Sequence, residues 1–153
     1  MEWKTVVEQL FPDGNEVRQE GDLLLGEGVC GEQTIAVIGT TNHTEVGVEL
    51  ALAMAAEVLA VIRNHPDRPI LFLVDTGGQR LRHRDEMLGL NGYMAHLAKC
   101  VEMARRWDHP VISLVYEQGP CSRGSWARLL PATSRCPFRP RACAARSSSP
   151  RRM

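Results

Sequence analysis

Two consecutive glycines follow an apolar run near the middle of the chain. Residues 69–75 read PILFLVD, which predicts a buried strand, and Thr76, Gly77 and Gly78 come directly after it. Because glycine permits positive φ and close approach of a ligand, two backbone amides here could bind an oxygen that gains negative charge in a reaction. Removing one such donor typically costs about 3–4 kcal/mol in a transition state. The same residues also fit an ordinary tight turn between a strand and a helix.

Polar residues on both sides of the glycines are candidates for contacting a substrate: Asp75, Thr76, Gln79 and Arg80. Asp75 and Thr76 are also expected to fix the turn, because their short side chains hydrogen-bond readily to nearby backbone amides. Gly77 and Gly78 are the candidate catalytic residues of the segment.

Two neighbouring segments could contribute to the same site. A basic cluster follows the glycines and consists of Arg80, Arg82 and Arg84. It could hold a phosphate or dock an acidic protein, although such clusters more often lie in a solvated loop without a binding role. The loop of residues 42–44, Asn-His-Thr, lies between a predicted strand and a predicted helix and could line an acyl site, although an ordinary connection is more common. The five histidines share no spacing typical of metal ligands, so no metal site is predicted.

The elements that must position these residues alternate between strands and helices. The apolar patterns predict a short helix over 3–10, strands over 22–29 and 33–39, a helix over 45–63 with Thr44 as its N-cap, a strand over 69–75, a second long helix over 84–106 and a strand over 111–116. This order predicts an α/β layered fold with parallel pairing across the helices. The run over 33–39 is nearly all apolar, so it should lie in a sheet that is covered on both faces.

Charge divides the chain into two unlike parts. The formal net charge is zero, yet residues 1–118 hold all 18 acidic residues, and residues 119–153 hold eight arginines with no acidic residue. The second part consists mainly of Arg, Pro, Ser, Ala and Cys and shows no strand or helix period, which predicts disorder or an origin in a frameshift near Gln118 and Gly119. Charge alone could bind nucleic acid, but no aromatic interleaving supports that, and we expect no nucleic-acid partner.

The cellular setting follows from what the sequence lacks. No run of about 18 apolar residues predicts a membrane helix, and the charged, amphipathic N-terminus is unlike a signal peptide. The five cysteines show no C-x-x-C pair. We therefore expect a cytoplasmic protein with reduced thiols and no membrane partner.

Three spaced segments together resemble one family. GTTNHTEVGVELALAMAAEVL, LFLVDTGGQR and RDEMLGLNGYMAHLAKCVEMARRWDHPVISLVYEQ resemble the gamma subunit of biotin-independent malonate decarboxylase, over about residues 10–118. They are more distantly similar to the alpha half of acetyl-CoA carboxylase carboxyltransferase. The resemblance implies a crotonase-like α/β fold of stacked strand-strand-helix units, of which residues 1–118 would form the incomplete N-terminal half.

The resemblance also implies a chemistry. The family is a carbon–carbon lyase that converts malonyl on an acyl carrier protein to acetyl and CO2, with backbone amides stabilising the thioester enolate. The expected partners are a beta subunit and the acyl carrier protein. The carrier's phosphopantetheine-type group would serve as the substrate arm, with no biotin and no cofactor bound by the chain itself. Gly77 and Gly78 match the family's Asp-Thr-x-Gly turn, as oxyanion donors or as residues that shape the acyl pocket.

One departure from the family keeps two alternatives open. After the strand over 111–116, the family continues with a second glycine loop, whereas residues 119–126 read GPCSRGSW and contain no tandem glycine. The chain could instead be a carboxyltransferase alpha-like subunit, which a neighbouring biotin carrier gene would favour. It could also be an inactive fragment with at most a partner-binding role.

Overall fold

The computed structural model describes residues 2–116 of the chain. The Arg-rich segment from 119 onward, its suggested frameshift and the altered glycine loop lie outside these residues. The elements, in chain order, are α1 (Trp3–Leu10), β1 (Arg18–Glu20), β2 (Leu23–Cys30), β3 (Gln33–Thr40), β4 (Thr44–Val46), α2 (Val48–Asn64), β5 (Ile70–Val74), β6 (Thr76–Gln79), α3 (His83–Met87), α4 (Leu90–Arg106) and β7 (Val111–Val115).

A five-stranded mixed sheet in the order β1-β2-β3-β5-β7 forms the centre of the fold. β2 and β3 are the two strands predicted over 22–29 and 33–39, and they form an antiparallel hairpin from Leu23 opposite Thr40 to Cys30 opposite Gln33. β3, β5 and β7 are parallel neighbours, since Phe72 of β5 pairs with Ile38 on one side and Ser113 on the other. The predicted parallel pairing across the helices is therefore confirmed, whereas the short, exposed strand β1 was not predicted.

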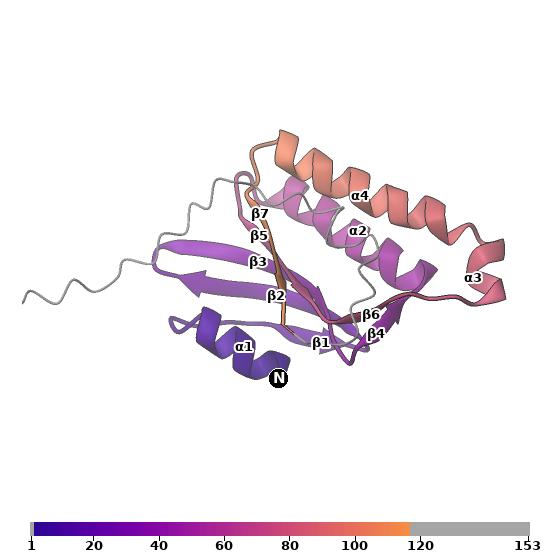
Figure 1. Ribbon diagram of the computed structural model, residues 1–153. Coiled ribbons are helices and arrows are strands. Elements are labelled where there is room, and N and C mark those ends of the chain that lie inside the picture. Colours follow the sequence, from indigo (N-terminus) through magenta and orange to yellow (C-terminus); the bar gives the residue numbers. More distant parts are fainter. Residues whose placement is uncertain (1, 117–153) are drawn as a thin grey trace, which may run out of the picture.

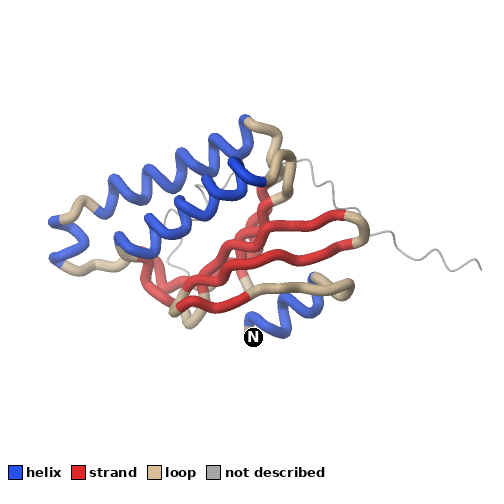
Figure 2. Tube along the Cα trace, turned by 180° about the vertical axis from the view of Figure 1, so that it is seen from behind, coloured by secondary structure: helices blue, strands red, loops and turns tan. Residues whose placement is uncertain are grey.

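Helices cover the sheet on both faces (Figures 1 and 2). α2 and α4 lie together over one face, where they pack on a core that includes Ile38 and Phe72. α1 lies on the opposite face, where Val7 contributes to a second core with Val37 and Leu73. The prediction that β3 is covered on both faces is thus confirmed. Among the described residues, no helix has the length and apolar character needed to cross a bilayer.

The predicted N-cap of the first long helix is wrong. Thr44 begins β4, which pairs with β6 in a separate two-stranded parallel sheet, and α2 begins only at Val48 after Gly47. The Val48 N–H donates to Asp85 Oδ1 at 3.2 Å, so a carboxylate distant in the sequence replaces the local cap. The segment after β5, predicted as a turn, likewise pairs as β6.

The second long helix, predicted over 84–106, is two helices. Gly89 has a φ of 77°, a left-handed conformation that ends α3 and precedes α4. The apolar spacing along this helix predicts Met87 as a core residue, but the break turns it outward to 75% exposure, while Leu90 is fully buried. Farther along α4 the same apolar spacing predicts Leu97 and Val101 as core residues, and both are buried.

Candidate functional site

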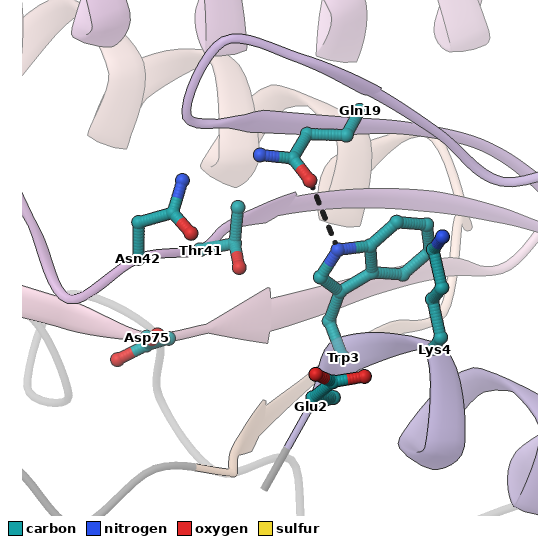
Figure 3. A pocket seen from close by; sticks show the side chains of 7 residues that line it. All are labelled: Glu2, Trp3, Lys4, Gln19, Thr41, Asn42 and Asp75. Atoms are coloured by element: carbon teal, nitrogen blue, oxygen red, sulfur yellow. Dashed lines mark hydrogen bonds between the residues drawn. The ribbon is translucent and has the colours of Figure 1, made fainter.

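A cavity lies at the end of the sheet where β3 and β5 finish. It has a volume of about 430 Å³. Its lining residues are Glu2, Trp3, Lys4, Gln19, Thr41, Asn42 and Asp75 (Figure 3). Thr41 and Asn42 directly follow β3, and Asp75 directly follows β5. The carboxyl ends of parallel strands are the usual place for ligands in α/β folds, so this cavity is the candidate site.

The start of α1 forms one wall of the cavity. The Trp3 indole N–H donates to Gln19 Oε1 at 3.1 Å, which fastens the helix to β1 (Figure 3). The Lys4 ammonium lies 5.7 Å from the centre of the Trp3 ring, within the range of a cation–π contact. These residues were not predicted as part of a site, because they are far from the glycines in sequence and belong to no motif.

Asp75 joins the ends of the two strands. Its backbone N–H donates to Thr40 Oγ1 at 3.1 Å, and its Oδ2 accepts the His43 N–H at 2.9 Å. The residue is only 2% exposed, and its Oδ1 has no hydrogen-bond donor among the described residues. Among residues 2–116, the nearest basic atom is His43 Nδ1, 3.5 Å from Oδ1. A buried carboxylate oxygen in this state is costly and is typical of a functional position.

The loop between β3 and β4 has an unusual backbone. Asn42 and His43 have φ values of 62° and 49°, which non-glycine residues adopt rarely and mostly where surrounding contacts enforce them. Asp22 enforces this conformation from outside, since it accepts hydrogen bonds from Asn42 Nδ2 and Thr44 Oγ1, each at 2.9 Å. Together with Asp75, these contacts hold the His43 backbone in one place.

The two predicted catalytic glycines have different surroundings. The Gly78 N–H donates to Thr76 Oγ1 at 3.0 Å, which is the predicted side-chain bond that fixes the turn. Gly77 is exposed, and the β4–β6 register passes from Thr44 opposite Thr76 to Glu45 opposite Gly78, so Gly77 sits at a bulge. A Cβ on Gly77 would lie 3.4 Å from His43 Nε2, so the glycine leaves room for the imidazole.

Gln79 and Arg80 do not line the cavity, and neither do Thr76, Gly77 and Gly78. Gln79 Nε2 is 3.4 Å from Asn91 Oδ1, and the Arg80 N–H donates to Val46 O. The Arg80 guanidinium lies beside Gly47, and its Nε is buried without a hydrogen-bond acceptor in the described part of the chain. Their contact with a substrate stays a prediction.

The basic cluster also has a structural use. Arg84 Nη1 lies 2.6 Å from Glu49 Oε1 on the surface. A hydrogen bond to the backbone and then the Arg84 guanidinium lower the pKa of Glu49, while Glu49 raises the pKa of Arg84. Arg84 of α3 therefore pairs with the first turn of α2 at the surface, where such a pair adds little stability. In residues 2–116, no group of three or more His, Cys, Asp or Glu side chains is arranged to hold a metal ion.

Comparison of the sequence with known families agrees with the family that the sequence resembles. Comparison of the structure with solved structures agrees with the fold that the resemblance implies. The family model for the malonate decarboxylase gamma subunit matches residues 41–127. No curated protein matches the chain. A Pseudomonas malonate decarboxylase MdcD-MdcE hetero-dimer is similar at TM-score 0.55 and 22% identity, over 62% of this chain and 43% of that chain. The Pseudomonas hetero-tetramer in complex with malonate gives TM-score 0.57 and 22% identity, over 69% and 48%.

A third similar structure is the geranyl-CoA carboxylase beta subunit of P. aeruginosa. It gives TM-score 0.61 and 18% identity, over 75% of this chain and 22% of that chain. At these identities the likeness shows the fold alone, which is the crotonase-type α/β fold of carboxyltransferases, and this chain spans less than half the length of the matched structures. Because the family model matches more than half of its residues, the chain belongs to the malonate decarboxylase gamma subunit family.

Proposed function

We propose that this chain acts with a beta subunit in converting malonyl on an acyl carrier protein to acetyl and CO2. The observation that carries the proposal is the family match over residues 41–127, because that stretch contains the loop after β3 and the end of β5, which line the cavity together. The substrate arm would be the phosphopantetheine-type group of the carrier, and the chain itself would bind no biotin.

The chemistry needs an acceptor for the electrons that CO2 leaves behind. When the carbon–carbon bond breaks, its electron pair moves toward the thioester oxygen, and a positioned N–H stabilises the resulting enolate. We assign this role to the Gly77 N–H rather than to Gly78, since the Gly78 N–H donates to Thr76 Oγ1. Gly78, with a φ of 109°, would shape the bend that presents Gly77.

Turnover by the complex tests the proposal. The chain is purified with the beta subunit, and CO2 release from malonyl-carrier is measured. CO2 release that depends on both subunits supports the proposal. A stable complex that releases no CO2 supports the inactive-fragment alternative. Carboxylation of a biotin carrier, without net decarboxylation, supports the carboxyltransferase alternative.

Two glycine variants test the site within that complex. Gly77→Ala places a methyl group 3.3 Å from His43 O and 3.4 Å from His43 Nε2, so it should displace the reacting groups. Contacts at these distances move the neighbouring atoms by only a few tenths of an ångström, so we expect kcat to fall by roughly tenfold, less than the 10²-fold that a misplacement of about 1 Å can cause. Gly92→Ala is the matched control, because its methyl group would meet no heavy atom of the described chain within 4 Å. Equal activity in both variants would remove Gly77 from the site.

A further inference from the structure

One carboxylate holds both the backbone and the ring of His43. Asp75 Oδ2 accepts the His43 N–H at 2.9 Å, and Asp75 Oδ1 lies 3.5 Å from Nδ1 of the same residue. The second distance exceeds that of a well-formed hydrogen bond, yet such contacts often tighten when a substrate binds. Since Oδ1 is buried and has no other donor among residues 2–116, the His43 ring is its available partner.

The two ring nitrogens of His43 have different surroundings. Nδ1 faces a carboxylate whose side chain is 2% exposed, whereas the His43 side chain is 40% exposed. Nε2 lies on the side of Gly77, where the missing Cβ leaves space for the ring. A partly exposed histidine whose Nδ1 faces a buried carboxylate is the usual arrangement of a group that transfers protons through Nε2.

We propose that His43 donates the proton that completes the reaction and that Asp75 is its positioning residue. This inference rests on the proposed function. Loss of CO2 breaks the bond between the carboxylate carbon and C2 of the malonyl thioester and leaves an enolate. The proton on His43 Nε2 then passes to C2, and the new C–H bond gives the acetyl thioester. His43 keeps the proton on Nδ1, toward Asp75, and regains the Nε2 proton from solvent through its exposed side.

The first measurement reports the ring itself and needs no turnover. Nitrogen-15 NMR of the chain distinguishes a neutral imidazole protonated at Nδ1 from one protonated at Nε2. We expect the Nδ1–H form at His43 in the unsubstituted chain and a loss of that preference in Asp75→Asn. His83→Asn, an exposed histidine of α3, identifies signals that do not belong to His43. An Nε2–H form in the unsubstituted chain would overturn the positioning role of Asp75.

The second measurement separates proton transfer from folding, in the complex with the beta subunit. Asparagine and glycine both tolerate the φ of 49° at this position, so His43→Asn and His43→Gly should fold. We expect kcat to fall by on the order of 10²–10³-fold in both, with KM changed less than about threefold. Added imidazole should restore turnover in His43→Gly roughly tenfold and leave His43→Asn unchanged, because only glycine vacates the space.

The outcomes distinguish the two proposals. If the unsubstituted complex releases no CO2, the proposed function fails and the donor role fails with it, while the NMR result still decides whether Asp75 holds the ring. If the complex is active and His43→Gly keeps more than half of its kcat, the proposed function stands and the donor role is overturned. A lowered kcat that imidazole does not restore would also overturn it, because a purely structural histidine predicts that result.

Discussion

The first turn of α2 depends on a carboxylate from another helix. The first amide N–H groups of α2 have no acceptor within the helix. Gly47, which precedes the helix, has no side chain that could accept their hydrogen bonds. Asp85, the buried residue of α3, accepts the Val48 N–H at 3.2 Å and is 1% exposed. We therefore predict that Asp85→Ala destabilises the protein by uncapping α2, although it lies 37 residues from Val48 in the sequence.

Two known effects give the expected loss in the free energy of unfolding of Asp85→Ala. Loss of a side-chain N-cap costs about 0.5–2 kcal/mol. A hydrogen bond to a charged group contributes about 1.5–3 kcal/mol. The ranges meet near 2 kcal/mol, so the free energy of unfolding of Asp85→Ala should fall by about 2 kcal/mol. Asp85→Asn keeps an acceptor oxygen but loses the charge that favours a helix N-terminus, so it should lose about 1 kcal/mol.

Urea unfolding, followed by circular dichroism, measures these differences. Glu86→Ala is the matched control, since Glu86 is the next residue of the same short helix and is exposed. Its free energy of unfolding should stay within about 0.5 kcal/mol of the unsubstituted chain, as is usual for surface changes. A loss below about 0.5 kcal/mol in Asp85→Ala, or an equal loss in Glu86→Ala, would refute the capping argument.

Two further predictions concern α4. Gly92→Ala should raise the free energy of unfolding by about 0.5–1 kcal/mol in urea, because the methyl group meets no heavy atom of the described chain within 4 Å and alanine favours the helix; a loss of stability would contradict the open space there. Burial raises the pKa of the Cys100 thiol, so the native chain keeps that proton to higher pH than the unfolded chain does. The free energy of unfolding should therefore decline as the pH rises above about 8.5, where an unfolded thiol ionises, and Cys100→Ala should decline less steeply over the same pH series; parallel curves would count against the burial effect.

The main strands could be predicted because their signal is local. All five residues of β5, from Ile70 to Val74, are buried, and the apolar run that predicts the strand is itself the cause of that burial. The same holds for β3, whose last six residues are buried. Parallel pairing followed from the intervening helices, since two parallel strands need a long crossover connection.

The sequence predictions were wrong where a distant residue or a backbone conformation decided where a helix or strand begins and ends. Thr44 has the residue type of an N-cap, but Asp85 caps the helix from another element and leaves Thr44 to pair as a strand. Gly89 interrupts an apolar pattern that continues on both sides of it, and the pattern alone does not show its φ of 77°. The cavity wall at Trp3 and Gln19 was missed for a related reason, because only the folded sheet brings them beside Asp75.

The structure also changes which backbone amides are available as oxyanion donors. The sequence predicts two adjacent amides as a pair of oxyanion donors, but Gly78 donates to Thr76 Oγ1, so Gly77 cannot form that pair with its neighbour as the bend now stands. A second donor would have to be a residue other than Gly78. The parallel strands β3 and β5 end at the same edge of the sheet. β7 ends there as well, because the Tyr116 hydroxyl donates to Thr40 O at 3.0 Å. The reacting group would then lie between strand ends rather than within one turn, a position that Asp75 and His43 already share.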